Sequence, residues 1–399
     1  SPGPEQMAAG EDKRAFAAGN ASNNQKRIFA TNAGRHLDGL EIMIRLCLGL
    51  ISYFCLAFLL AVAQPVSALA AANEQRLRVL TWPGYADADV VQVFEQRTNS
   101  KVEVTVVDSD AVLWQKVAQD TKADEVFDVI AVNTAELQRY IRAGLVLPIA
   151  AESLPNLASQ LPRFRDLRAI PGLVQGDEVY GIPYAYAEMG LIYDRQQVAE
   201  APDSIAALWD ERYRGKVLAF DDGTHNFSLA AQSLGRADPF RIAGRDWPAI
   251  VERLIALRRN VLSFYSKPEE SVELFRTRHA ALMLANYGSQ QWQLMRATGA
   301  DVGYAIPKEG ALAWLDCWAI TRNARDKRLA EGWINYMLEA GPGEVLRKRH
   351  GLDSTTAAPA HRQESDVLIW LQPVEDVDRR NRLWSRIVSG DRLGKVLAP

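Results

Sequence analysis

A nearly continuous apolar run at residues 127–132 (FDVIAV) is the feature that most restricts the fold of this chain. Such a run is typical of a strand that is buried on both faces of a sheet. Helical patterns flank it at residues 112–122 and 135–143, and alternating, strand-like segments precede it at residues 76–81 and 101–107. Strands that alternate with helices form βαβ units, so the sequence predicts an α/β fold with a mostly parallel sheet.

A second set of strand and helix patterns follows. Residues 216–220 and 280–284 are short strand-like segments, and a helical pattern follows each of them. A strand-rich stretch at residues 181–193 separates the two sets. Two α/β lobes that face each other would place all these strand ends around one ligand cleft.

The first seventy residues are not expected to belong to the folded core. Residues 1–42 are rich in Ala, Asn, Gly and charge and have no apolar periodicity, so we interpret them as a disordered upstream leader. Residues 43–70 begin with Met43 and Arg45, continue as an apolar run and end in Ala-Leu-Ala, which is the order of a cleavable secretory signal. The competing interpretation is a transmembrane anchor, because the apolar run is nearly long enough to span a bilayer.

Composition limits the cellular compartment and the classes of binding partner that we expect. The chain has 399 residues and a formal net charge of −3, so it carries no electrostatic footprint for nucleic acid. Cys47 and Cys55 would leave with the signal and only Cys317 would remain, so no internal disulfide is expected. An exported protein with one cysteine fits the bacterial periplasm, where a large core replaces disulfides.

The segment at residues 304–320 (YAIPKEGALAWLDCWAI) carries the most specific chemistry. Strict alternation places Trp314, Asp316 and Trp318 on one face of a strand. A carboxylate between two indoles can hold an organic ammonium group, because the carboxylate supplies charge and hydrogen bonds and the rings add cation–π attraction. The alternative is that the two Trp pack in a core and Asp316 ends or caps an element.

Further aromatic and polar residues follow predicted strands. Trp82 and Tyr85 follow the strand at residues 76–81, and Asn133 follows the strand at residues 127–132. Ligands of α/β sheets bind outside the carboxyl ends of the strands, so these residues are candidates for a ligand site. The other candidates are Tyr186 and Glu188, which alternate with Tyr184 in the stretch 181–193, and Tyr287 and Ser289, which follow residues 280–284. The alternatives are a hydrophobic plug for Trp82 and helix capping for Asn133.

Motifs for catalysis, metals and cofactors are missing. The sequence has no Gly-rich phosphate loop after a strand, no G-x-S-x-G and no H-E-x-x-H. Beyond the signal, histidines stand only at positions 225, 279, 350 and 361, with no pair at ligand spacing. We therefore expect no catalytic residue, no metal and no cofactor. A periplasmic enzyme built on the same two lobes is the less favoured alternative.

Four segments resemble the putrescine- and spermidine-binding periplasmic proteins of ABC importers. They are TWPGYADADVVQVFEQRTNSKVEV, FDVIAVNTAELQRYIRAG, GIPYAYAEMGLIYD and, most specifically, IPKEGALAWLDCWAI. The resemblance implies an α/β, two-lobe periplasmic binding protein of type II with the ligand cleft between its lobes. The implied lobes comprise residues 76–186 with 308–355, and residues 187–307 with 356–399. It further implies a monomer that captures a polyamine or related amine and delivers it to a membrane permease, with no nucleic acid involved.

The resemblance also implies roles for single residues. Trp314 matches an aromatic wall of the family, and Asp316 matches a carboxylate that holds ammonium. Ser289 replaces a second family carboxylate, and Asn286 replaces an aromatic residue. Glu188 stands where the family has a small hydroxyl residue, so it could supply a relocated carboxylate. A family Glu is also replaced, near Thr224.

These departures leave the ligand open. An unpaired buried ammonium is costly, so the loss of acids at one end suggests a ligand with a single ammonium, such as an ω-amino acid, an amino alcohol or another monoamine. The sequence gives such monoamines and putrescine-like diamines equal weight. Sequence does not separate a transport role from a role as a ligand sensor for a membrane receptor.

Overall fold

The structure is a computed structural model that describes residues 75–119, 126–359, 361, 363 and 365–398. The predicted leader (1–42) and signal (43–70) lie outside the described residues, as does the end of the helix predicted at 112–122. Within the described part, no helix is long and apolar enough to cross a membrane.

The first sheet gathers strands from distant parts of the sequence. Its strand order is β14 (Asp353–Ser354), β7 (Ile182–Glu188), β13 (Ala311–Thr321), β3 (Val129–Asn133), β1 (Gln75–Thr81) and β2 (Ser100–Val106), and β4 (Val146–Leu147) and β15 (Leu368–Trp370) also pair with β13. Strand β1 is parallel to β2 and β3, as βαβ units require. Strand β13 is antiparallel to β3 and β7. The prediction of a mostly parallel sheet is therefore wrong here, because β13 enters from the second sheet without a crossover helix.

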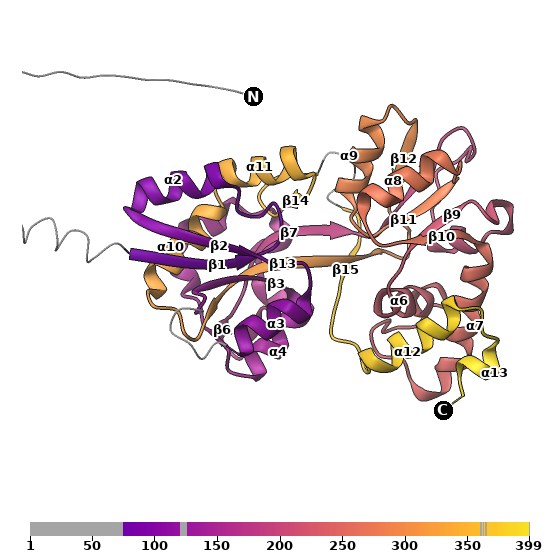
Figure 1. Cartoon of the computed structure of the whole chain (residues 1–399), viewed down its shortest axis with the longest axis horizontal. Coiled ribbons are helices and arrows are strands. Elements are labelled where there is room, and N and C mark those ends of the chain that lie inside the picture. Colours follow the sequence, from indigo (N-terminus) through magenta and orange to yellow (C-terminus); the bar gives the residue numbers. More distant parts are fainter. Residues whose placement is uncertain (1–74, 120–125, 360, 362, 364, 399) are drawn as a thin grey trace, which may run out of the picture. The chain divides into compact units, whose positions relative to one another are not determined.

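The second sheet is smaller, and two of its strands are directly connected in sequence to strands of the first sheet. Its order is β10 (Val261–Tyr265), β9 (Val217–Phe220), β11 (Leu282–Ala285), β8 (Gly190–Asp194) and β12 (Val302–Ala305). Strand β7 leads into β8, and β12 leads into β13, so the chain crosses between the sheets at both places (Figure 1). A short hairpin of β5 (Val174–Gln175) and β6 (Glu178–Val179) stands apart. The lobe boundaries given above stay a prediction, and β13 and β9 lie in different sheets as those lobes require.

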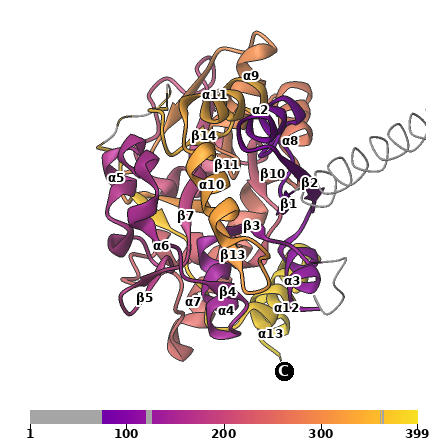
Figure 2. The same ribbon diagram turned by 90° about the vertical axis from the view of Figure 1, so that its left-hand side faces the viewer.

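Helices cover both faces of the first sheet. One face carries α2 (Ala88–Thr98), α10 (Lys327–Met337) and α11 (Ala340–His350), and the other carries α3 (Asp110–Ala118) and α4 (Thr134–Arg142). Figure 2 shows α10 in front of β13, where Trp333 packs on Trp318 with ring centroids 6.0 Å apart. Val90, Val91 and Phe94 form the buried face of α2, as their spacing predicts.

The second sheet has its own helices. They are α6 (Gly223–Ser233), α7 (Trp247–Asn260), α8 (Pro268–Thr277), α9 (Ser289–Ala297), α12 (Val377–Val388) and α13 (Leu393–Val396), while the short α5 (Pro162–Arg165) belongs to the first sheet. Helix α12 packs against α6 and α7. Its fully buried Arg380 bonds Glu375 and the carbonyl of Thr224. That contact fixes the first turn of α6.

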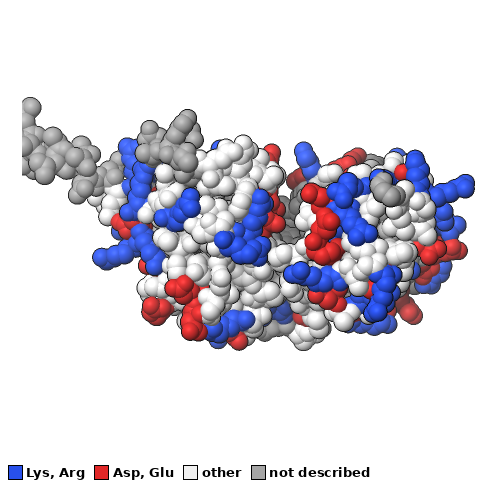
Figure 3. All heavy atoms as spheres, turned by 90° about the horizontal axis from the view of Figure 1, so that it is seen from below, with Lys and Arg blue, Asp and Glu red and all other residues white. Residues whose placement is uncertain are grey.

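The face of the molecule seen in Figure 3 shows no strong charge separation. Lys and Arg lie between Asp and Glu over this face. This distribution agrees with the formal net charge of −3. A surface hollow lined by Glu103, Thr105 and Gln115 lies beside β2 and α3 and contains none of the predicted site residues.

Candidate functional site

Asp316 on β13 is the centre of the predicted site, and two other predicted residues hold it. The Tyr85 hydroxyl donates to Oδ2 at 2.6 Å, and Asn133 Nδ2 donates to Oδ1 at 3.3 Å. Asp316 is only 8% exposed. The carboxylate therefore has one partner on each oxygen and little contact with water.

Each partner is positioned by its own local structure. Asn133 ends β3 directly opposite Asp316, and its Oδ1 also accepts from Ala135 N at 3.0 Å to cap α4. The capping role and the contact with Asp316 thus coexist. Tyr85 closes a turn after β1 by donating its N–H to the carbonyl of Trp82. Tyr184 OH then donates to the Tyr85 carbonyl at 3.1 Å, which fixes the turn against the core.

Burial controls the protonation of this carboxyl group. It raises the pKa of Asp316 to about 7, against the lowering effect of the bonds from Tyr85 and Asn133. The negative charge of Asp110 adds to the increase. Burial likewise raises the pKa of the Tyr85 hydroxyl, so Tyr85 stays a neutral donor. A cation beside Asp316 would favour its charged form.

Trp314 extends the site toward the second sheet. It lies on the same face of β13 as Asp316, two residues away, and is half-buried. Its Nε1 donates to the carbonyl of Asn286 at 3.1 Å. Trp82, also half-buried, packs at the edge of the cores of the first sheet, and within the described chain nothing accepts from its buried Nε1. Trp318 is fully buried against Tyr85, so for this residue the core interpretation holds.

Tyr186 and Glu188 do not reach Asp316. Cross-strand partners share a face, and these two residues stand opposite Leu315 and Ala313, which alternate with Asp316. Tyr186 packs on Phe164, with ring centroids 4.9 Å apart. Both predicted site residues thus point to the other face of the β7–β13 pair.

An irregularity in β7 explains why alternation fails there. Asp316 pairs with Ala185 but Cys317 pairs with Pro183, so Tyr184 is an extra residue in the ladder. A bulge of this kind shifts the alternation by one residue. Tyr184 therefore faces Tyr85 and Trp318, whereas Tyr186 faces the opposite core.

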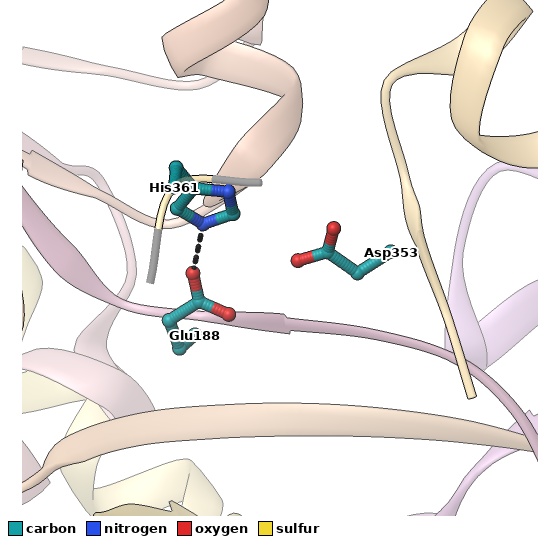
Figure 4. Close-up of side chains that lie close together, drawn as sticks. All are labelled: Glu188, Asp353 and His361. Carbon is teal, nitrogen blue, oxygen red and sulfur yellow. Dashed lines mark hydrogen bonds and ion pairs between the residues drawn. The ribbon is translucent and has the colours of Figure 1, made fainter. Parts of the chain in front are cut away.

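Glu188 belongs to a separate buried cluster with Asp353 and His361 (Figure 4). His361 Nε2 lies 2.6 Å from Glu188 Oε1, and its ring packs on Tyr304. The potential metal-ligand atoms of these three side chains lie within 4.8 Å of one another. His361 and Glu188 are thus in direct hydrogen-bonding contact. Sequence reasoning missed this cluster, since residues 188, 353 and 361 share no local pattern.

Tyr287 and Ser289 lie on the link between β11 and α9. Tyr287 is half-buried and its hydroxyl donates to the Ser266 carbonyl at 2.8 Å. Ser289 is buried at the first turn of α9. Between them, Gly288 has φ +47°, and a Cβ there would lie 3.0 Å from the Glu188 carbonyl and 3.1 Å from Ala187 Cβ. The link therefore lies directly against β7, beside Trp314.

Comparisons with known proteins agree with this architecture. A family model described as bacterial extracellular solute-binding protein matches residues 89–342. The putrescine-binding periplasmic protein PotF of Escherichia coli (strain K12) is 27% identical over 287 residues, covering 67% of this chain and 74% of that protein. The putrescine-binding periplasmic protein SpuD of Pseudomonas aeruginosa (strain UCBPP-PA14) is 25% identical over 366 residues, covering 83% and 97%.

A solved structure shares the fold. The crystal structure of the spermidine/putrescine ABC transporter substrate-binding protein PotD from Streptococcus pneumoniae superposes with a TM-score of 0.64 at 18% identity, covering 81% of this chain and 99% of that one. The predicted two-lobe α/β fold is thereby confirmed.

Proposed function

Because this chain belongs to the family of bacterial extracellular solute-binding proteins, we propose that it captures a small organic amine for an ABC importer. The two relatives named as putrescine-binding proteins support an amine as the ligand. We place the protein in the periplasm, exported by the signal at residues 43–70. Its partner is the membrane permease of the importer, and the protein acts as a monomer.

The observation that carries this proposal is the buried carboxyl group of Asp316. A buried carboxylate is costly to keep charged unless a cation or several donors accompany it. Tyr85 and Asn133 each donate one hydrogen bond, and the group still has a pKa raised to about 7. An ammonium group would supply the missing positive charge.

Aromatic side chains complete the amine site. Trp314 and Trp82 are half-buried, and Tyr85 contacts the carboxylate directly. Indole and phenol faces attract an organic cation and exclude water from its alkyl chain. This is chemistry for holding an amine, not for transforming it.

We further propose that the protein has no catalytic turnover. The groups that contact Asp316 are a hydroxyl with a raised pKa and an amide, neither of which activates a nucleophile. Amine recovered chemically altered after incubation with the pure protein would contradict this proposal.

A direct binding experiment tests the function. The chain from residue 71 is titrated calorimetrically with putrescine, spermidine and ω-amino acids, and its melting temperature is measured with each compound. A bound ligand stabilises the native state by mass action, so at least one amine should raise the melting temperature. If no compound with an ammonium group binds, or if Asp316→Asn binds as well as the parent protein, the proposal is wrong.

A further inference from the structure

Glu188, Asp353 and His361 bring one imidazole and two carboxylates together in the interior (Figure 4). The side chains of Glu188 and His361 are 0% and 1% exposed, and Asp353 is 1% exposed. The Asp353 carboxylate points toward the other two groups. Charged groups at this depth are paired with one another or coordinate a metal ion. The His361–Glu188 contact involves two of the three side chains, whereas a metal ion would engage all of them.

Strand pairing places the two carboxylates on one side of the first sheet. Asp353 on β14 pairs with Tyr186 on β7, and Glu188 lies two residues further along β7. Residues two apart on a strand share a face, so the two carboxylates are diagonal neighbours across the strand pair. They lie on the face opposite Asp316. The cluster is therefore separate from the proposed amine site.

Aromatic rings orient the imidazole of His361. Its ring meets Tyr304 of β12 at 4.6 Å between centroids, in an edge-on arrangement, and Trp292 of α9 at 5.5 Å. The Tyr304 hydroxyl in turn donates to the Glu188 carbonyl at 3.1 Å. These contacts hold the histidine and the glutamate in one arrangement, as a metal site requires of the residues around its ligands.

The spacing of the ligand atoms suits a single ion. One potential ligand atom from each of the three side chains lies within 4.8 Å of the others. Metal–ligand bonds of about 2.0–2.2 Å place ligand atoms about 3.0–3.4 Å apart in octahedral or tetrahedral coordination. Small side-chain rotations would therefore bring all three groups onto one ion. Each carboxylate can give one oxygen or both, so a buried ion could complete its coordination with little water.

We propose that Glu188, Asp353 and His361 bind a divalent transition-metal ion, for which Zn²⁺ is the appropriate probe. Imidazole nitrogen together with carboxylate oxygen suits Zn²⁺, whereas Ca²⁺ and Mg²⁺ prefer oxygen ligands alone. A divalent ion bound to neutral imidazole also balances the charge of both carboxylates. The sequence predicts no metal because no two histidines stand at ligand spacing, but these ligands come from three distant segments.

The ion would stabilise the chain where it crosses between the two sheets. Glu188 is the last residue of β7, directly before the crossing to β8, and Asp353 belongs to the first sheet. The ring of His361 packs on Tyr304 and Trp292, which belong to β12 and α9 beside the second sheet. A metal ion would thus join elements of both sheets. This role is structural and does not depend on the proposed amine function.

Zinc binding by the parent protein is the first test. The chain from residue 71, without an affinity tag, is freed of metal with EDTA and titrated calorimetrically with Zn²⁺ and Ca²⁺ at a pH where imidazole is neutral. We expect one equivalent of Zn²⁺ per chain, weaker binding of Ca²⁺, and a rise of roughly 3 °C or more in the melting temperature at saturating Zn²⁺. If Zn²⁺ does not bind, or if Ca²⁺ binds as tightly, the inference is wrong and the amine-binding proposal is unaffected.

A ligand variant and a matched control locate the zinc. Asp353→Asn keeps the size of the side chain and removes a ligand charge, so it should weaken Zn²⁺ binding by roughly hundredfold or more. Asp222→Asn is the control, because Asp222 Oδ1 also lies near a histidine, 3.6 Å from His225 Nδ1, and Asn keeps the cap of α6. The control should bind Zn²⁺ like the parent. Undiminished binding by folded Asp353→Asn, or an equal loss in both variants, overturns the inference.

A crystal of the parent protein keeps the inference testable if Asp353→Asn does not fold. The crystal is soaked with Zn²⁺, and anomalous X-ray scattering locates the ion. Zinc should lie between the side chains of Glu188, Asp353 and His361. Zinc bound elsewhere, with none at this cluster, overturns the inference.

Discussion

The Tyr85 hydroxyl donates a 2.6 Å hydrogen bond to Oδ2 of Asp316, across 231 positions of sequence. This bond joins the turn after β1 to the strand that returns from the second sheet. Any change in the turn therefore reaches the carboxylate directly.

Tyr85→Phe should weaken amine binding while keeping the ring packing. The variant removes one donor from a buried carboxylate, which should cost about 1–3 kcal/mol of affinity. Calorimetry with the best amine of the parent protein measures this loss. The variant should keep the packing of the ring against Tyr184, where the centroids lie 5.4 Å apart. An affinity equal to that of the parent would show that Tyr85 does not tune Asp316.

Asp316→Asn should remove most of the affinity without harming the fold. The bound ammonium would lose its counter-ion, and truncation of one member of a buried charged pair costs about 2–5 kcal/mol. Trp82→Ala should cost less, on the order of 1–3 kcal/mol, through lost contact and cation–π attraction. The melting temperature of the ligand-free Asn variant should match or exceed that of the parent, since a buried charge is removed. A much lower value would mean that Asp316 is a structural residue.

Amine affinity should fall as the pH falls. Asp316 in the empty protein has a pKa of about 7, above its ordinary value near 4, and a bound ammonium favours the charged form. Binding below pH 7 therefore releases a proton, and affinity should drop toward about tenfold per pH unit between pH 6 and 5. Calorimetry in buffers of different ionisation enthalpy measures the proton, and Asp316→Asn should abolish its release.

The raised pKa of Asp316 affects the stability of the ligand-free protein in the opposite direction: affinity should rise with pH, whereas this contribution to stability should fall. The folded state binds more protons than the unfolded state between pH 4 and 7, so the stability due to Asp316 is fully present below pH 4 and is lost as the pH rises through 7. The free energy of unfolding of Asp316→Asn should lack this decrease. Chemical denaturation at several pH values compares the two proteins. Identical pH slopes would contradict the assignment.

Sequence periodicity predicted the site where the chain is regular. Alternation along β13 correctly placed Trp314 and Asp316 on one face, and the end of β3 brought Asn133 opposite Asp316. It failed where the ladder is irregular, because the extra residue in β7 separates Tyr184 from Tyr186. Register between distant strands depends on tertiary pairing, which no local pattern encodes.

Contacts between distant segments of the chain also could not be predicted from the sequence. The sequence predicts Glu188 as a relocated carboxylate; in the structure it lies 2.6 Å from His361, on the face of the strand pair opposite Asp316. The hydrogen bond from the Trp314 indole to the Asn286 carbonyl and the close approach of Gly288 to β7 likewise emerge only in the folded chain.

Glu188→Gln should reduce stability and leave amine affinity unchanged. The variant weakens a buried, charge-assisted contact with His361, at a cost of about 1–3 kcal/mol in the free energy of unfolding. Its side chain points away from Asp316, so affinity should stay within about 0.5 kcal/mol of the parent. Denaturation and calorimetry measure the two quantities separately. A large loss of affinity with normal stability would restore Glu188 as a ligand residue.

Gly84→Ala should disturb the turn that carries Trp82 and Tyr85, and Gly215→Ala is its matched control. Both glycines have positive φ, +81° and +74°, so each Ala variant should lose about 1–2 kcal/mol of stability from backbone strain. Only at Gly84 would the new Cβ meet a side chain, 2.6 Å from Cγ of the His350 ring, whereas nothing lies within 4 Å at Gly215.

Because of the clash at Gly84, the two variants should differ in both stability and amine affinity. His350 is held in place by Asp87, whose Oδ1 lies 3.0 Å from Nε2, so the turn has to move instead of the ring. Gly84→Ala should therefore lose about 1–3 kcal/mol more stability than Gly215→Ala. It should also weaken amine binding, because Tyr85 is displaced from Asp316. Denaturation and calorimetry on both variants give the comparison, and equal affinities for the two would show that the turn does not position the site.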